Sequence, residues 1–376
     1  MRALVLGLGL ATSIGVLASQ SAGTVGDGAV RSQLTLSSLS VTVATVPGAD
    51  GSSNRDLPLP SGPTSARLKV GILHSHPQLR IGELGGSDLW YDLWLTRTDA
   101  PSSWVLEAQP AVSDPSVSNN DAAVSADVVG TIPLSHETVV DPASTLSVAL
   151  VATGDDAGRL VLNWGLNRWS ADFGFGKAPP PAPSPPDQDQ DDDQPDPLAG
   201  NVDYDADNSA VARNVTLAAR HETALTLPDD SRINVLFGRE ITTQHDDFAA
   251  IAAMSDGEVI RLTEAAVIRL RTEEPLRFGG ISVPTDNLSP GFPGSYGLWL
   301  KRAGQGWKLV FNHEADSWGT QHHPEFDAAE VDVTYSRNPS SAHPLGAALI
   351  PTGEGTGRLM IHWGPHVWTT EFTIDS

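Results

Sequence analysis

Residues 357–372 read GRLMIHWGPHVWTTEF, and residues 158–173 read GRLVLNWGLNRWSADF. Both segments contain Gly-Arg-Leu, then Trp-Gly, then a second Trp and a Phe at the same spacing. Apolar residues alternate on either side of the Trp-Gly pair, which predicts two strands joined by a tight turn. Two strands with one apolar face are not stable alone in water, so each segment needs further strands to close a core. The two segments therefore predict an all-β fold that is built twice.

The repetition extends upstream of these hairpins. Residues 93–97 (LWLTR) match 298–302 (LWLKR), and Asp-Ala-Ala recurs at 121–123 and 327–329. Eight of the ten Trp residues fall into four equivalent pairs. At matched places in a doubled β-fold, Trp is more often core than ligand platform, because burial of its large ring is favourable. The predicted core rings are Trp94, Trp104, Trp164, Trp169, Trp299, Trp307, Trp363 and Trp368.

Short apolar runs separated by Gly and Pro, with little helical period, predict many short strands in each copy. The expected architecture is two tandem β-sandwich domains, or flattened barrels, related by internal duplication. We assign the first β-domain to residues 65–177 and the second to residues 213–376. Residues 178–212 contain a Pro-rich run, then nine Asp, and no Lys or Arg. Such a composition predicts a disordered linker.

The N-terminus resembles an export signal. Arg2 precedes an apolar run over residues 3–17 and small residues follow, which predicts a signal peptide over residues 1–22; an uncleaved anchor is the alternative. Residues 23–64 are expected to be a mobile lead-in with an edge strand near residues 34–46. The chain has no Cys, so disulfides are excluded, as in many proteins of the bacterial periplasm or surface. The expected location is therefore periplasmic or extracellular.

The charge of the chain restricts its partners. There are 46 acidic and 23 basic residues, and the formal net charge is −23. Binding to nucleic acid or anionic lipid needs clustered Lys and Arg, which this sequence lacks. No stretch is long and apolar enough for an integral membrane span. The expected partner is an unidentified ligand or a component of the cell envelope.

One loop of the second copy concentrates His, Asp and Glu side chains, and the first copy has none of these histidines in the equivalent interval, residues 108–121. Histidine and carboxylate side chains are the ligands of zinc and related ions. The spacing of the His, Asp and Glu residues in this loop fits no recognised metal motif, so a solvated loop is the competing interpretation. The sequence requires no cofactor and leaves a divalent metal as an alternative. The candidate ligands are His313, His322, His323, Glu325 and Asp327.

Other signatures of chemistry are absent from the sequence. No Gly-x-Ser-x-Gly elbow, phosphate-binding glycine loop or dinucleotide fingerprint occurs, so we assign no catalytic residue. His362 and His366 lie four residues apart across the predicted turn, and strand alternation places His362 on the outward face.

Several landmarks of the second copy occur together in a known family. They are GSYGLW at residues 294–299, WKLVFN at 307–312, WGTQ at 318–321, and the final hairpin. With these, the last third of the chain resembles a bacterial exported family called domain of unknown function 2911. Arg261 and Glu264 are similar to its Arg…Glu-Ala segment. The resemblance implies an exported all-β domain without an established activity.

We take Arg261, Glu264 and Trp318 as candidate binding residues, with cross-strand ion pairing as the alternative for the two charged ones. The expected function is an exported non-enzymatic binding or envelope-associated module. One alternative is a metal-assisted hydrolase that uses the His/Asp/Glu loop around Trp318. The other alternative is a purely structural spacer.

Overall fold

A computed structural model describes most of the chain between residues 29 and 375. The described residues are 29–36, 39–45, 67–76, 78–86, 89–98, 103–111, 128–154, 156–176, 220–238, 251–260, 262, 267–283, 285, 294–315, 322–338 and 343–375. Strands make up almost all of this structure, so the expected all-β class is confirmed. No helix among these residues is long and apolar enough to cross a membrane. The predicted signal peptide (1–22) and linker (178–212) lie outside the described residues.

The strands divide into two halves of the chain. The first half contains β1 (Val30–Leu36), β2 (Leu39–Thr45), β3 (Leu68–His76), β4 (Leu79–Ile81), β5 (Leu84–Gly86), β6 (Leu89–Arg97), β7 (Trp104–Pro110), β8 (Gly130–Ala152) and β9 (Ala157–Phe175). The second half contains β10 (Arg220–Thr226), β11 (Arg232–Gly238), β12 (Val259–Ile260), β13 (Ile268–Thr272), β14 (Leu276–Phe278), β15 (Ile281–Val283), β16 (Ser295–Ala303), β17 (Gly306–Asn312), β18 (Asp327–Arg337), β19 (His343–Gly353), β20 (Thr356–Gly364) and β21 (His366–Ile374). Two short 3₁₀ turns, η2 (Ile251–Ala253) and η3 (Pro324–Phe326), complete the second half.

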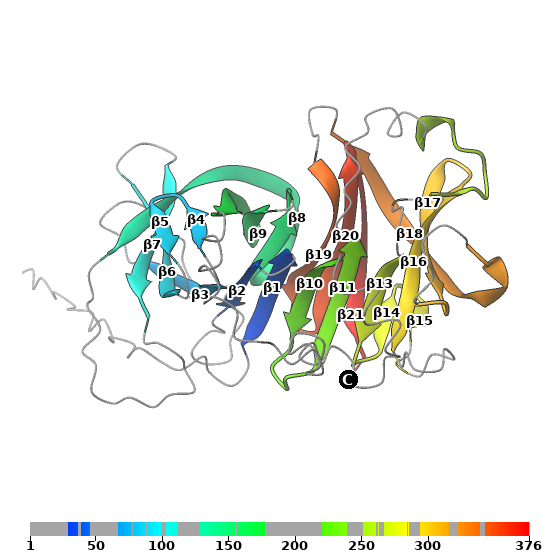
Figure 1. The fold of residues 1–376 in the computed structure, drawn as a ribbon, viewed down its shortest axis with the longest axis horizontal. Helices are drawn as coiled ribbons and strands as arrows, with labels where there is room; N and C mark the ends of the chain where they lie inside the picture. Colours follow the sequence, from blue (N-terminus) through cyan, green and yellow to red (C-terminus); the bar gives the residue numbers. More distant parts are fainter. Residues whose placement is uncertain are drawn as a thin grey trace, which may run out of the picture.

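One antiparallel layer, which we call the front layer, runs through both halves. Its order is β8-β7-β6-β3-β2-β1 in the first half and β10-β11-β13-β16-β17-β18 in the second. The two parts join where β1 pairs with β10, between the blue and green strands of Figure 1. Each half thus contributes six neighbouring strands in the same sequence order.

A back layer covers the front layer in each half. In the first half β5, β4, β9 and β8 pair in that order. In the second half β15, β14, β21, β20 and β19 do so. β8 and β18 each pair with strands of both layers, which closes one side of each half. The shared pattern is what the predicted repeat requires; its origin by duplication stays a prediction.

The hairpin that ends the chain forms as the sequence predicts. β20 and β21 pair from Thr356↔Thr373 to Trp363↔His366, so the turn is Gly364-Pro365. Gly364 has φ +54°, a left-handed conformation that glycine adopts without a steric penalty. In the first half, Gly165 has φ +55° and β9 folds back on itself there. The two arms of β9 meet where Arg159 binds Asp172 through two hydrogen bonds of 2.6 and 3.2 Å.

Three of the four matched Trp pairs lie in the main cluster of buried residues: Trp104/Trp307, Trp164/Trp363 and Trp169/Trp368. Trp104 packs edge-on against Trp169 with ring centroids 5.1 Å apart, and Trp307 packs against Trp368 in the same way at 5.5 Å. Seven of the eight predicted core rings are buried. Trp94 is the exception: it is half-buried on the outer face of the front layer.

The N-terminal boundary of the fold was predicted wrongly. β1 and β2 lie in the middle of the front layer, whereas residues 23–64 were expected to form a mobile lead-in with an edge strand. Their alternate residues enter the core: Leu34, Leu36, Val41 and Val43 are all buried. The alternation was visible in the sequence, but the partner strand β10 lies far along the chain and was not.

The halves are also less separate than two tandem domains would be. One continuous cluster of buried residues includes side chains from both halves, for example Leu34 and Leu225. β8 of the first half lies against β19 of the second, and β1 pairs with β10. Core packing therefore connects the two predicted domains.

Candidate functional site

A second apolar cluster lies on the outer face of the front layer in the second half. Along β16, Tyr296, Leu298 and Leu300 point into the main core, and Trp299 points to the opposite side. Trp299 packs there with Val267 and Val310, apart from the main core. We call this surface the Trp299 face; it also carries Arg269, Gly297 and Asn312, which follow by alternation on β13, β16 and β17.

The described residues between β17 and β18 (313–315 and 322–326) lie along this face, and we call them the covering segment. Ala315 is fully buried, and its carbonyl accepts a hydrogen bond of 2.8 Å from Nε of Arg269. Gly297 allows this close approach, because a Cβ at that position would lie 2.8 Å from the carbonyl oxygen of Glu314. Arg269 is itself only 2% exposed. The covering segment is thus held on the sheet by backbone contacts.

His322 and Asp327 form the first polar pair of the site. Nε2 of His322 lies 2.7 Å from Oδ1 of Asp327, and the His322 ring is 5.3 Å from that of Trp299. A carboxylate only accepts hydrogen bonds, so this contact assigns the proton to Nε2. Both side chains are largely buried. The imidazole is therefore held in one orientation against the indole.

His323 and Glu314 form a second pair nearer to solvent. Nδ1 of His323 lies 2.8 Å from Oε2 of Glu314, and both side chains are partly exposed. The two pairs are connected through Asn312, a buried residue at the end of β17. Its Nδ2 donates to Oδ1 of Asp327 (2.9 Å) and to the carbonyl of His323 (3.0 Å), and its Oδ1 accepts from the amide of Glu314 (2.8 Å).

Asn312 was not among the sequence candidates. A polar side chain that ends the apolar run WKLVFN was the only signal of its role. Buried amides are generally hydrogen-bonded, so such a residue predicts a local network. It does not reveal which side chains take part.

The five candidate metal ligands do not form one cluster. His322 with Asp327 and His323 with Glu314 are separate pairs, Glu325 is exposed on η3, and His313 packs on Tyr296 at 5.7 Å. Within the described part of the chain, no three His, Cys, Asp or Glu residues are placed to hold a metal ion. The other candidates, Arg261, Glu264 and Trp318, lie outside that part.

Alternation places His362 on the outward face of β20, where a solvent-facing or a sheet-covering residue is expected. The side chain is only 4% exposed, so it covers the sheet and does not face solvent. It pairs across the sheet with Gly346, and a Cβ on that glycine would lie 2.3 Å from its Nε2. The ring fills the space that the missing side chain leaves. His366 is also buried, and its Nδ1 lies 2.7 Å from the hydroxyl of Tyr335.

The equivalent face of the first half is built from ion pairs. Trp94 occupies the place of Trp299, and the charged ends of Arg67 and Lys69 lie over its ring at 5.0 and 5.7 Å. Lys69 also pairs with Asp92 at 3.0 Å, and Arg67 with Glu107 at 2.9 Å.

The described part of the Trp299 face has no cation over its indole ring and instead has the His322–Asp327 pair beside it. Beyond this face, Lys301 donates a hydrogen bond of 2.6 Å to Glu330, which raises the pKa of Lys301. The two halves therefore use the same surface differently.

Comparison with known families finds a match within the second half. Residues 253–372 match the family model described as "Protein of unknown function (DUF2911)". The second half carries a DUF2911 region. The expected resemblance is thus confirmed, and the DUF2911 region contains β12 to β20 and most of β21, including the whole covering segment. No curated protein and no solved structure matches the chain.

Proposed function

We propose that the protein is an exported, non-enzymatic binding module of the cell envelope, and that its ligand contacts the covering segment of the Trp299 face. The observation that carries this proposal is the contrast between the halves. The second half has two histidine–carboxylate pairs connected through Asn312, whereas the first half places ion pairs over Trp94. Histidine–carboxylate pairs connected through a buried amide, on one of two similar scaffolds, are expected of a site rather than of a framework.

The chemistry of the site restricts the ligand class. Imidazole and carboxylate groups can exchange several hydrogen bonds with hydroxyl, amide or amine groups. A net charge of −23 disfavours polyanions. Neutral or cationic polar molecules, such as oligosaccharides and peptides, fit best. The export part of the proposal is supported by Arg2 and the apolar run of residues 3–17.

The test is an oligosaccharide array and a peptide array probed with the mature full chain, followed by calorimetric titration of each hit. His322→Gln should weaken a true hit at least about tenfold, the effect of losing one well-placed hydrogen bond in a desolvated site. Arg67→Gln is the matched control, because Arg67 lies over Trp94 as His322 lies beside Trp299. A hit weakened by Arg67→Gln and not by His322→Gln would place the site elsewhere. Arrays without any hit would favour the structural-spacer function.

The metal-assisted hydrolase gains no specific support from the described residues, since its ligands lie in separate pairs. Stoichiometric metal in the purified protein, lost in His322→Ala, would reverse this preference.

A further inference from the structure

The small hairpins β4–β5 and β14–β15 occupy the same place in the two halves. Arg80 pairs with Gly85 on one side and Gly174 on the other, and Arg277 pairs with Ser282 and Thr373. The amide of Gly176 donates to the carbonyl of Gln78 at 2.9 Å, and that of Asp375 donates to the carbonyl of Pro275 at 2.9 Å. These matching contacts align the two surfaces residue by residue.

Arg277 is paired with a carboxylate of its own chain. Its Nε and one terminal nitrogen donate to the two carboxylate oxygens of Asp375 at 3.1 and 2.7 Å. This side-by-side geometry is the preferred one between arginine and a carboxylate. The pairing raises the pKa of Arg277 and lowers the pKa of Asp375. The second half thus shows how a carboxylate is bound at this position.

The first half keeps the arginine and lacks the carboxylate. Gly176 stands where the second half has Asp375, and Gly85 and Gly174 replace Ser282 and Thr373. Among the residues that the structure describes, Arg80 makes no hydrogen bond or ion pair. A Cβ on Gly176 would lie 3.7 Å from Nε of Arg80, so a carboxylate attached there could reach the guanidinium.

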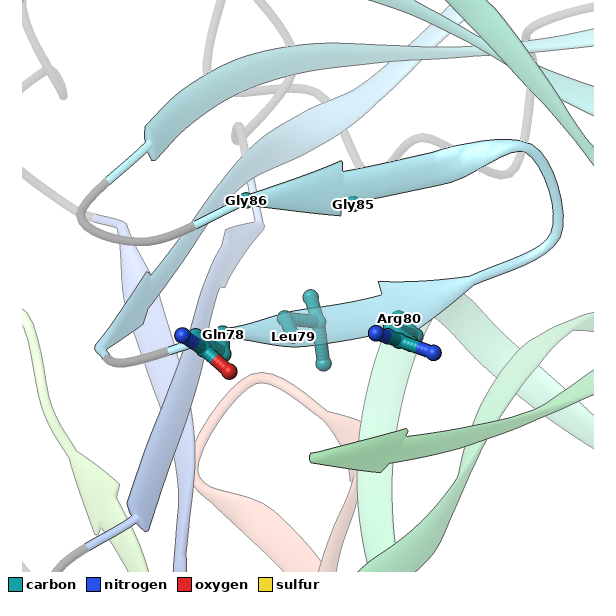
Figure 2. Close-up of a pocket in the computed structure, with 5 residues that line it drawn as sticks. All are labelled: Gln78, Leu79, Arg80, Gly85 and Gly86. Atoms are coloured by element: carbon teal, nitrogen blue, oxygen red, sulfur yellow. The ribbon is translucent and has the colours of Figure 1, made fainter. Parts of the chain in front are cut away.

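A depression in the surface lies beside Arg80. It is lined by Gln78, Leu79, Arg80, Gly85 and Gly86, so it includes one of the three glycines, Gly85. Figure 2 shows Gln78 and Arg80 projecting on the same side of β4, while the two glycines of β5 add no side chain. Gln78 has φ +49°, an unfavourable conformation for a residue with a Cβ, and such strain is often found at binding sites.

We propose that this depression binds a carboxylate group of another molecule. The Arg80 guanidinium donates hydrogen bonds to that carboxylate as Arg277 donates to Asp375. The Gln78 side chain borders the same position, because its Oε1 lies 2.8 Å from where the Cβ of residue 176 would be. The proposal concerns the first half only and does not depend on the function proposed for the Trp299 face.

The expected affinity for a single carboxylate is low. Exposed ion pairs contribute about 0–1 kcal/mol, which corresponds to a Kd of about 0.2 M or weaker for an isolated carboxylate. The binding should weaken further when sodium chloride is added, because the site is open to solvent. A larger molecule that carries the carboxylate would bind more tightly through its other contacts.

The test follows the arginine Nε–Hε NMR signals of the full chain during titration with N-acetyl-aspartate methylamide, which reproduces an aspartyl side chain. The Arg80 signal, assigned with Arg80→Lys, should shift progressively as the compound is raised to about 0.2 M. N-acetyl-asparagine methylamide, which lacks the charge, should cause a clearly smaller shift at the same concentration and ionic strength. An unresponsive Arg80 signal, or equal responses to both compounds, would refute the proposal.

Two reciprocal variants complete the design. Gly176→Asp supplies the carboxylate within the chain, so the Arg80 signal should move toward that of Arg277 and lose its response to titration. The change is sterically mild, because the nearest atom is the flexible end of Gln78. Asp375→Gly removes the carboxylate that pairs with Arg277, so the Arg277 signal should then respond to added N-acetyl-aspartate methylamide. Persistence of the wild-type Arg80 response in Gly176→Asp would contradict the proposal, whereas exchange of the two responses would support it.

Discussion

The place of β1 in the core can be tested by shortening one side chain. Leu34 is 0% exposed and belongs to the cluster of buried residues that includes both halves. Replacing a buried Leu by Ala costs about 2–5 kcal/mol, from lost transfer free energy and the cavity left behind. Leu34→Ala should therefore lower the free energy of unfolding by about 3 kcal/mol. If residues 23–64 formed a mobile lead-in, the same change would have almost no effect.

Leu166→Ala is the matched control, because it makes the same chemical change at a residue that is 49% exposed. Exposed substitutions usually change stability by less than about 0.5 kcal/mol. Urea unfolding followed by Trp fluorescence measures both variants. With an m value of about 3 kcal/mol/M, Leu34→Ala should lower the midpoint by about 1 M. If the two variants have equal midpoints, the assignment of β1 to the core is wrong.

The same experiment tests whether the halves unfold together. β1 pairs with β10, and the buried cluster is continuous, so the stability lost in Leu34→Ala should also be lost by the second half. Hydrogen exchange of β20 amides should accelerate in Leu34→Ala by the factor that corresponds to the loss of global stability. Unchanged protection of β20 would mean that the halves are energetically independent.

Three further predictions concern single sites. Gly346→Ala should destabilise the protein by about 1–3 kcal/mol in urea unfolding, because the new Cβ would overlap His362. Asp375→Asn should alter the pH dependence of stability. The hydrogen bonds from Arg277 lower the pKa of Asp375 in the folded protein below its value in the unfolded chain. The pair therefore stabilises the fold at a pH above the unfolded pKa, and this stabilisation is lost as the pH falls through the folded pKa. The Tm difference between wild type and Asp375→Asn should therefore shrink between about pH 5 and pH 2. Elemental analysis of the purified protein should find less than one metal ion per chain, because the candidate ligands lie in separate pairs. One metal ion per chain that is lost in His322→Ala would instead support the metal-assisted hydrolase.

Much of the candidate site was visible in the sequence as composition but not as geometry. The loop after β17 was singled out for its His, Asp and Glu residues, and two of the expected histidines do lie on the Trp299 face or beside it. The expected common cluster did not follow, because adjacent residues such as His322 and His323 point to different partners. Asn312 was missed, since one amide in a strand gives no sign of how many groups it will connect.

By itself, the sequence determined the strands, the hairpin turns and the burial of most of the Trp rings. These follow from local causes: alternation decides which face of a strand is apolar, and a large ring such as Trp368 is stabilised by burial wherever the strand lies. Only the tertiary structure decided that β1 joins β10, that the halves share a core, and that Arg80 lacks the carboxylate that Arg277 has. The physical reason is that an alternating strand can pair with any strand of complementary pattern, so its partner is set by the packing of the whole chain.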